Sequence, residues 1–185
     1  MNALAQPSTE GSRPIHLVQG EYLVSGDSHV AFTTILGSCV AACMRDPHAR
    51  VGGMNHFLLP GALEGPAEGI ERGVHAMELL INALLKAGAR RDRLEAKLFG
   101  GARMIRNLSD IGAQNAAFAA DFLKQERIAN CGGSLGGDQA RRIRFWPASG
   151  KAQQRLLDSG EKTIFAREMS IAATPAAPAG DVEFF

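Results

Sequence analysis

Two apolar segments separated by a short polar stretch are the feature that most limits how this chain can fold. The first covers Thr33 to Met44 and the second covers Val51 to Pro60, each long enough to form a β-strand. The polar stretch between them contains an Asp-Pro pair, which favours a turn. We therefore expect a β-hairpin. A turn centred just after Pro47 would place Cys39 directly opposite His56, with Cβ atoms about 4.5–5.5 Å apart.

A thiol that faces an imidazole can act as a nucleophile, because the imidazole can remove the thiol proton. Attack on an amide or ester carbonyl also requires donors for the developing oxyanion, and the backbone amides near Gly37 and Ser38 suit this role. The histidine needs a partner for its second ring nitrogen, and the nearby candidates are Thr33, Thr34 and Asn55. The alternative is structural: a buried cysteine packs as a small apolar side chain, and a one-residue slip in register would separate the pair.

The composition sets limits on the function. The chain has 185 residues, of which 45% are apolar and 21% are charged, as is ordinary for a globular domain. A net charge of +1 gives no electrostatic reason to expect nucleic-acid binding, and no apolar run is long enough to insert into a membrane. Residues 1–14 lack the basic start and apolar core of a secretory signal. Three cysteines without a disulfide spacing favour a reducing, cytoplasmic location.

The rest of the chain is expected to form one domain with a flexible segment at each end. These are a flexible leader at 1–14, a single domain at 15–172, and a disordered tail with an apolar tip at 173–185. Apolar residues at three- and four-residue steps predict two helices, one from Ile70 to a stop at Gly88 after a 61–69 loop, and one from about 113 to 126. Short apolar runs predict further strands within 16–25, 29–36, 95–100, 141–146, 153–157 and 163–165. Strands at both ends with helices between them favour an α+β fold.

Two further motifs have weaker functional interpretations. A set of Cys39, Cys43, His48 and His56 could surround a zinc ion, but the spacing is not that of a structural zinc site, so we expect no metal. Gly100 and Gly101 end a predicted strand. Glycines there either let a substrate backbone approach closely or form a bulge or turn.

Five motifs, in order along the chain, resemble the chemoreceptor glutamine deamidase family (CheD) of bacterial and archaeal chemotaxis. They lie within residues 16–157 and read LGSCVA at 36–41, GGMNHFLLP at 52–60, AMELLIN at 76–82, AKLFGGA at 96–102 and IGAQN at 111–115. Two segments depart from the family pattern: 134–137 lacks the usual acidic residue before Gly-Gly, and 138–141 lacks the usual Gly-Arg step. Both lie outside the predicted hairpin, so they concern partner or substrate contacts.

The resemblance implies an active site, a reaction and a fold. In that family a cysteine is the nucleophile, a histidine is its base, and a threonine six residues before the cysteine completes the site; here these are Cys39, His56 and Thr33. The implied reaction hydrolyses specific glutamine side chains on methyl-accepting chemotaxis receptors to glutamate and ammonia, without a cofactor. The implied fold is a layered α/β/β/α sandwich with mixed β-sheets, similar to toxin-type cysteine deamidases. Residues expected to bind the substrate or the oxyanion are Gly37, Ser38, Asn55, Gly100 and Gly101.

Two other functions stay open. The protein could be a regulatory module that docks a CheC-type phosphatase, or a cysteine esterase that acts on receptor methyl esters. The resemblance implies that docking and deamidation can coexist, because a partner could occupy the same groove, which we expect beside the 60–69 loop. The acidic and aromatic tip at 181–185 is either a frayed end or a short docking peptide on a flexible tether.

Overall fold

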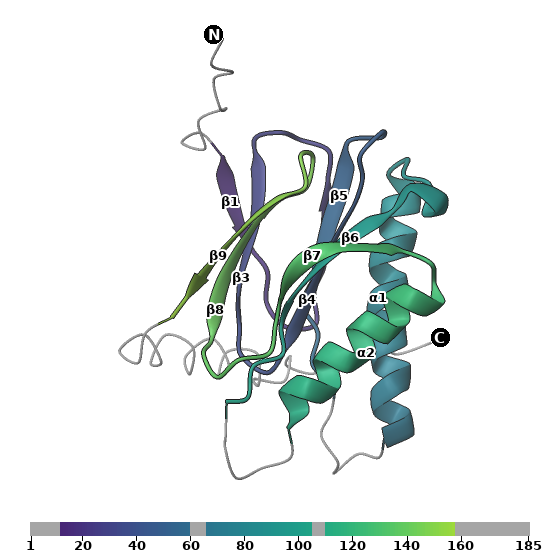
Figure 1. Cartoon of the computed structure of the whole chain (residues 1–185). Coiled ribbons are helices and arrows are strands. Elements are labelled where there is room, and N and C mark those ends of the chain that lie inside the picture. Colours follow the sequence, from purple (N-terminus) through teal and green to yellow (C-terminus); the bar gives the residue numbers. More distant parts are fainter. Residues whose placement is uncertain (1–11, 60–65, 105–109, 158–185) are drawn as a thin grey trace, which may run out of the picture.

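The computed structural model describes residues 12–59, 66–104 and 110–157. These residues form nine strands, two α-helices and one short 3₁₀ turn (Figure 1). In chain order the elements are β1 (Arg13–His16), β2 (Tyr22–Ser25), β3 (Val30–Leu36), β4 (Val40–Asp46), β5 (Val51–Asn55), α1 (Pro66–Lys86), the 3₁₀ turn η2 (Arg91–Arg93), β6 (Glu95–Gly100), α2 (Ile111–Gln125), β7 (Ala129–Leu135), β8 (Arg141–Trp146) and β9 (Lys151–Leu156).

The strands form two mixed sheets. The four-stranded sheet has the order β1-β3-β8-β9, and the five-stranded sheet has the order β2-β5-β4-β6-β7. Each sheet contains one parallel pair, β1 with β3 and β6 with β7, while the remaining pairs are antiparallel. The chain crosses from one sheet to the other between β3 and β4. We call residues 37–39 the crossover segment.

Two apolar cores hold three layers together. One core lies between the sheets and contains Phe32, Leu36, Met54 and Phe145. The other joins the five-stranded sheet to both helices, which pack on its outer face (Figure 1). The expected α+β class with two mixed sheets is therefore confirmed. Both described helices cover the same sheet, so the described residues form an α/β/β arrangement without the second helical layer of the expected sandwich.

Local sequence signals explain where the helices begin. The Asp110 side chain accepts a hydrogen bond from the Ala113 backbone N–H at 2.9 Å, which caps the start of α2. Helix α1 begins at Pro66, because proline suits a first helical position where its missing N–H would have no partner. The predicted helix near 113–126 is confirmed. The predicted start at Ile70 is four residues late, and residues 66–69 belong to the helix rather than to a loop.

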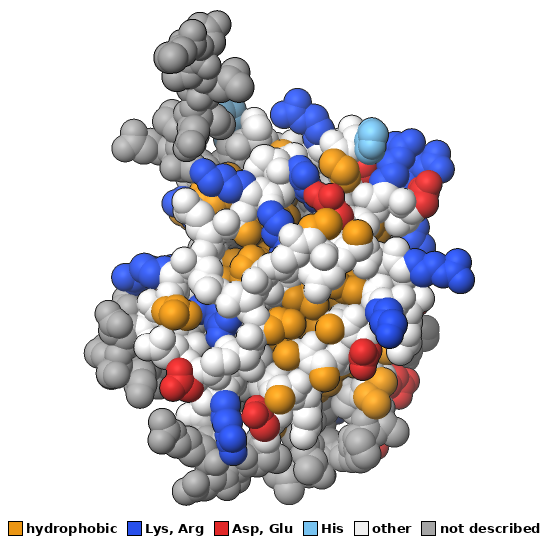
Figure 2. Space-filling model, in the orientation of Figure 1, with side chains coloured by type: hydrophobic (Ala, Val, Ile, Leu, Met, Phe, Trp, Pro, Cys, Tyr) orange, Lys and Arg blue, Asp and Glu red, His pale blue; other side chains and the backbone are white. Residues whose placement is uncertain are grey.

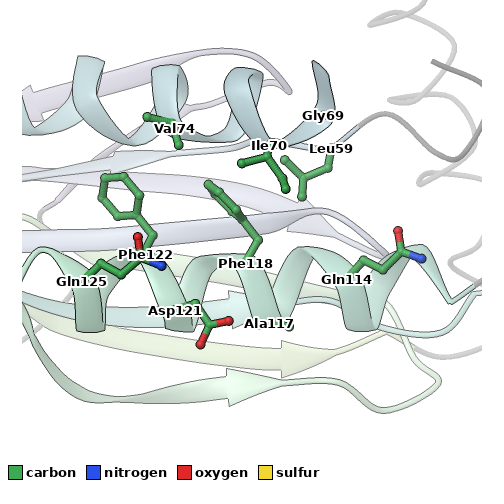
Figure 3. A pocket seen from close by; sticks show the side chains of 10 residues that line it. All are labelled: Leu59, Gly69, Ile70, Val74, Gln114, Ala117, Phe118, Asp121, Phe122 and Gln125. Atoms are coloured by element: carbon green, nitrogen blue, oxygen red, sulfur yellow. The ribbon is translucent and has the colours of Figure 1, made fainter. Parts of the chain in front are cut away.

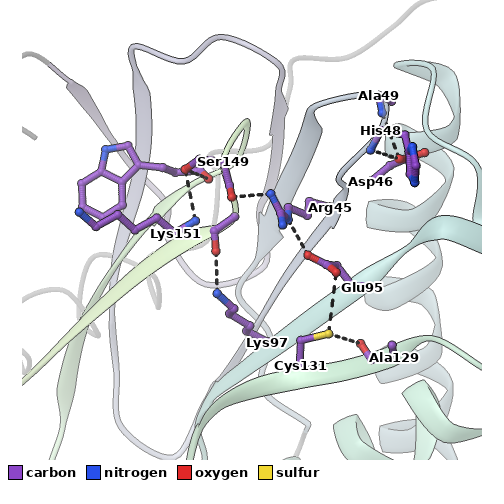
Figure 4. Close-up of polar contacts among 12 residues, drawn as sticks. Arg45, Asp46, His48, Ala49, Glu95, Lys97, Ala129, Cys131, Ser149 and Lys151 are labelled. Carbon is purple, nitrogen blue, oxygen red and sulfur yellow. Dashed lines mark hydrogen bonds and ion pairs between the residues drawn. The ribbon is translucent and has the colours of Figure 1, made fainter. Parts of the chain in front are cut away.

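The predicted hairpin is confirmed as β4 and β5, but its turn lies one residue later than expected. Asp46 pairs with Val51, so the turn contains residues 47–50. One carboxylate oxygen of Asp46 accepts hydrogen bonds from the backbone N–H groups of His48 (2.8 Å) and Ala49 (3.0 Å), which fixes this longer turn (Figure 4). Beyond the turn, an Arg45–Glu95 ion pair of 2.6 Å links β4 to β6. The expected segment 33–44 is also split, because β3 and β4 belong to different sheets.

Strand β7 has no counterpart in the sequence-based prediction. Its residues are nearly all exposed and include two glycines, so it shows neither an apolar run nor an alternating pattern. It forms because it adds in parallel to the edge of β6. At the other end, β1 starts at Arg13, inside the predicted leader. The rest of that leader up to residue 11, the predicted 163–165 strand, the 173–185 tail and most of the 61–69 loop lie outside the described residues.

Candidate functional site

Cys39 is the last residue of the crossover segment. Backbone hydrogen bonds join this segment to the residues at the end of β6. The Gly37 carbonyl accepts from the Ala102 N–H at 2.8 Å, and the Cys39 carbonyl accepts from the Gly101 N–H at 2.7 Å. Gly100 has φ +111°, and a Cβ atom there would lie 2.1 Å from the Cys39 carbonyl oxygen. Gly100 and Gly101 therefore support the cysteine through close backbone contact, and the Gly101 N–H is already occupied.

Asn115 ties the crossover segment to the chain that follows His56. This α2 side chain is fully buried, and its Nδ2 donates to the Ser38 carbonyl at 3.0 Å and to the Ile111 carbonyl at 2.9 Å. Its Oδ1 accepts from the Leu59 N–H at 2.7 Å. The sequence-based site did not include Asn115, although it is the last residue of the IGAQN motif. That motif was the signal that could have identified it.

The hairpin register differs from the expected one by two residues, which leaves Cys39 and His56 on the same face. The backbone groups of Val40 and Phe57 bond to each other in both directions at 2.9 Å, so Cys39 lies diagonal to His56 and not directly opposite. A shift of two residues preserves the face on which each side chain lies. Diagonal neighbours in a sheet have Cα atoms about 7–8 Å apart, within reach of long side chains. Both residues are buried between the sheets, with 1% of Cys39 and 6% of His56 exposed.

Thr34 determines which ring nitrogen of His56 carries the proton. The Thr34 hydroxyl lies 2.9 Å from His56 Nδ1 and donates its only proton to the Leu17 carbonyl at 2.7 Å. Because that proton is used, the Thr34 oxygen can only accept from the ring, so Nδ1 carries the hydrogen. The other nitrogen, Nε2, is then unprotonated. It is buried and has no hydrogen-bond partner. An unprotonated ring nitrogen of this kind can accept a proton.

The other two candidates for orienting the ring lie elsewhere. Thr33 faces away from the space between the sheets, and its hydroxyl donates to the Ile143 carbonyl of β8 at 2.9 Å. Asn55 faces the helices: its Oδ1 accepts from the Ala42 N–H at 2.9 Å and its Nδ2 donates to the Ala76 carbonyl at 3.1 Å. Neither side chain contacts His56, because neighbouring residues of a strand point to opposite faces. The structure therefore directs the Thr33 hydroxyl and the Asn55 amide away from the ring of His56, and their assignment to the site stays a prediction.

The Cys39 thiol has a hydrogen-bond partner that sequence reasoning missed. Its Sγ donates to Oε1 of Gln19 at 3.4 Å. Gln19 lies in the tight turn between β1 and β2, where nothing in the local pattern distinguishes it from an ordinary turn residue. The thiol proton is therefore directed toward Gln19 and not toward His56.

Burial keeps both the Cys39 thiol and the His56 imidazole uncharged. It lowers the pKa of His56 from 6.5 to about 4; a hydrogen bond with the Leu17 backbone acts in the opposite direction and the charge of His16 acts in the same direction. Burial also raises the pKa of the Cys39 thiol to about 12, partly offset by the N–H of its own backbone. The resting pair is thus a neutral thiol and a neutral imidazole. Such a pair can react by general-base catalysis, in which the ring takes the proton as sulfur attacks.

An apolar groove of about 440 Å³ lies between the two helices, on the other side of the five-stranded sheet. Phe118 and Phe122 of α2 project into it toward α1, and Leu59 closes one end (Figure 3). Neither Cys39 nor His56 lines this groove, so it is separate from the reactive pair. On the face shown in Figure 2, charged side chains lie mainly around the margin and hydrophobic ones in the middle.

The described residues offer no group of three or more His, Cys, Asp or Glu side chains that could hold a metal ion. His48 lies in the hairpin turn, at the opposite end of β4 from Cys39. Within 12–59, 66–104 and 110–157, no helix combines the length and the apolar character that a membrane span requires.

These observations define a class: an α+β protein of two packed sheets with a cysteine and a neutral histidine buried between them. Comparison with known proteins identifies the family. The model of the family described as CheD chemotactic sensory transduction matches residues 59–156. The chain belongs to this CheD family.

Relatives match along nearly the whole chain. One from Rhizobium leguminosarum bv. trifolii (strain WSM2304) is 55% identical over 179 residues, covering 95% of this chain and 96% of the relative. One from Agrobacterium fabrum (strain C58 / ATCC 33970) is 55% identical over 177 residues, covering 94% and 97%. One from Caulobacter sp. (strain K31) is 51% identical over 187 residues, covering 98% and 100%. All three are named "Probable chemoreceptor glutamine deamidase CheD".

Proposed function

We propose that this protein is a cytoplasmic enzyme that deamidates specific glutamine side chains of methyl-accepting chemotaxis receptors. Its family membership and the names of its relatives support the substrate. The observation that carries the chemistry is the buried Nε2 of His56, which lacks both a proton and a partner on the face that it shares with Cys39.

The proposed reaction runs in two stages. The Cys39 sulfur attacks the carboxamide carbon of the receptor glutamine while His56 Nε2 takes the thiol proton. Nε2 then returns that proton to the departing nitrogen, the C–N bond breaks, and ammonia leaves a glutamyl thioester on Cys39. His56 next removes a proton from water, which attacks the thioester carbon and releases glutamate and the free thiol. Every proton passes through one ring nitrogen, so no cofactor is required.

The residues around the pair have separate parts in this scheme. Backbone amides of the crossover segment, at Gly37, Ser38 and Cys39, are the proposed donors for the oxyanion, since the Cys39 N–H already lies close enough to its own sulfur to lower the thiol pKa. The family resemblance assigns the ring-steadying hydroxyl to Thr33. The contacts described above favour Thr34 for that role.

Release of ammonia from a receptor cytoplasmic fragment tests the proposal. Wild-type protein should convert individual glutamines to glutamates, located by peptide mass spectrometry. Cys39→Ala should reduce ammonia release to background while leaving the circular dichroism spectrum unchanged. Cys131→Ala is the matched control, because this cysteine is exposed and lies on the edge strand β7. Activity that survives in Cys39→Ala would refute the nucleophile.

The same assay separates the two other functions. A cysteine esterase would release methanol from methylated receptor faster than ammonia from the amidated form. A module that only docks a CheC-type phosphatase would bind that partner but leave receptor glutamines unchanged in mass. If both activities share one surface, the phosphatase should compete with the receptor fragment for binding.

A further inference from the structure

The turn between β1 and β2 contacts the Cys39 thiol through the side chain of Gln19. Val18 to Glu21 form a turn closed by a hydrogen bond from the Glu21 N–H to the Val18 carbonyl at 3.2 Å, with Gly20 at φ +89°. This is the geometry of a type II turn, which requires a positive φ at its third residue. Gln19 occupies the second position, and its half-buried side chain extends inward to the Cys39 sulfur.

The backbone of this turn is fixed to the strand that carries the histidine. The Gly20 N–H donates to the His56 carbonyl at 2.7 Å, and the His56 N–H donates to the Glu21 carbonyl at 3.1 Å. The turn therefore stays with β5. Since Cys39 is only 1% exposed, a substrate must displace something to reach the sulfur. With the backbone of the turn held by these bonds, the Gln19 side chain touches the sulfur and can still move by a change of rotamer.

Because of the contact between Gln19 and Cys39, His56 receives no hydrogen bond from the thiol. The thiol has one proton, and it donates that proton to Gln19 Oε1. His56 Nε2 is left buried without a partner. A hydrogen bond from sulfur to an amide oxygen brings the thiol to the oxygen side of the group, whereas attack requires approach to the carboxamide carbon. The contact is thus a resting state and not a step of the reaction.

From this geometry we propose that Gln19 is a positioning residue that occupies the carboxamide site of the resting enzyme. It holds the Cys39 thiol away from His56 until a substrate carboxamide replaces it. The occupant has the same side chain as the glutamine substrate, so this inference rests on the proposed function for the identity of the competitor. The hydrogen bond between Cys39 and Gln19 does not depend on which substrate the enzyme takes.

Two measurements on full-length protein test the inference. In the first, iodoacetamide alkylates the protein without receptor, and mass spectrometry follows each cysteine. Gln19→Ala should speed alkylation of Cys39 about fivefold, the factor that one ordinary hydrogen bond is worth. The exposed Cys131 is the internal reference and should react at an unchanged rate. Val18→Ala, an exposed neighbour in the same turn, is the matched control and should behave as wild type.

The second measurement is the steady-state deamidation of a receptor fragment. Gln19→Ala should lower KM several-fold with kcat unchanged, because removing a competing occupant affects binding and not chemistry. A fall in kcat would overturn the inference, since it would mean that Gln19 assists the reaction. An unchanged rate of Cys39 alkylation would overturn it as well. If the wild type deamidates nothing while Gln19→Ala still speeds alkylation, the proposed function fails and the resting contact stands.

Discussion

A single hydroxyl group decides the protonation of His56. Thr34 Oγ1 donates to the Leu17 carbonyl, which obliges the ring to donate from Nδ1 and leaves Nε2 free. Without the hydroxyl, Nδ1 loses this acceptor, and the tautomer with the proton on Nε2 becomes more populated. In the proposed mechanism the threonine therefore acts through the histidine.

We predict that Thr34→Val lowers kcat/KM for receptor deamidation about tenfold, as expected for one buried hydrogen bond to a working ring. Valine keeps the shape and the strand propensity of threonine, so the protein should still fold. It should be less stable by about 1–3 kcal/mol, because the Leu17 carbonyl loses its donor. Thr33→Val is the matched control, because the Thr33 hydroxyl bonds only to the Ile143 carbonyl on the far side of the sheet. Kinetic assays of the two variants show whether Thr34 or Thr33 orients the His56 ring. A large loss in Thr33→Val with none in Thr34→Val would favour the assignment made by resemblance.

The difference between Thr33 and Thr34 shows what single residues reveal from sequence. Thr33 lies six residues before Cys39, the spacing of the family threonine, and Thr34 lies five before it. The two side chains differ in the face of β3 from which they project. Phe32 and Leu36 mark the buried face, and Thr34 alternates with them. The apolar residue Ile35 on the opposite face hid that alternation, because β3 is buried on both faces. Gln19 could not be predicted at all, since its role comes from the packing of a distant turn.

The geometry of the β4–β5 hairpin explains why Cys39 and His56 share a face although the predicted register was wrong. Asp46 uses its carboxylate to bind the N–H groups of His48 and Ala49, which lengthens the turn and moves its centre by one residue. Each residue of displacement at the centre shifts the pairing by two. A shift of two keeps Cys39 and His56 on one face, so the face could be predicted from the apolar pattern although the exact partners could not.

Helix α2 reaches the site through one side chain. Asn115 bonds to the Ser38 carbonyl before Cys39 and to the Leu59 N–H after His56, so one amide holds both segments that carry the reactive pair. The bond to the Leu59 N–H is buried, so loss of the Asn115 amide would leave that N–H unpaired.

We predict that Asn115→Ala lowers the free energy of unfolding by about 2–3 kcal/mol, since it leaves buried backbone groups unpaired. Deamidation should fall as well, because the crossover segment loses its anchor. Urea denaturation and the ammonia assay measure the two effects. Gln114→Ala, on the exposed side of the same helix, controls for helix propensity and should change neither. Equal stability of the two variants would show that the anchor is dispensable.

Segments from both sheets assemble this site. Thr34 belongs to the four-stranded sheet, His56 follows the last strand of the hairpin in the five-stranded sheet, and Cys39 lies on the crossover between them. The pair and the ring partner therefore meet only when the two sheets pack. The sequence could predict the strands and their faces from apolar periodicity. It could not predict which strands join which sheet, because strand order depends on packing between distant segments.

Packing His56 between the sheets makes the stability of the whole fold depend on pH. Its folded pKa, about 4, lies below the ordinary value of 6.5. Below pH 6.5 the unfolded chain takes up a proton that the folded protein does not, so stability is fully present above pH 6.5 and falls progressively toward pH 4. From this shift the fold should lose about 3 kcal/mol between pH 7 and pH 4 through this residue alone.

We predict that His56→Gln removes this part of the acid sensitivity. Glutamine can still bond to Thr34 but takes up no proton in this range, so the variant should lose about 3 kcal/mol less than wild type between pH 7 and pH 4. Urea denaturation at half-unit pH steps measures the difference in unfolding free energy. The contributions of the other titrating groups cancel in this difference, because both proteins contain them. Gln114→Ala, an exposed substitution that removes no titratable group, should follow the wild-type curve. Parallel curves for wild type and His56→Gln would mean that His56 is already free to take up a proton in the folded protein. The ring would then be open to solvent, which contradicts its burial between the two sheets.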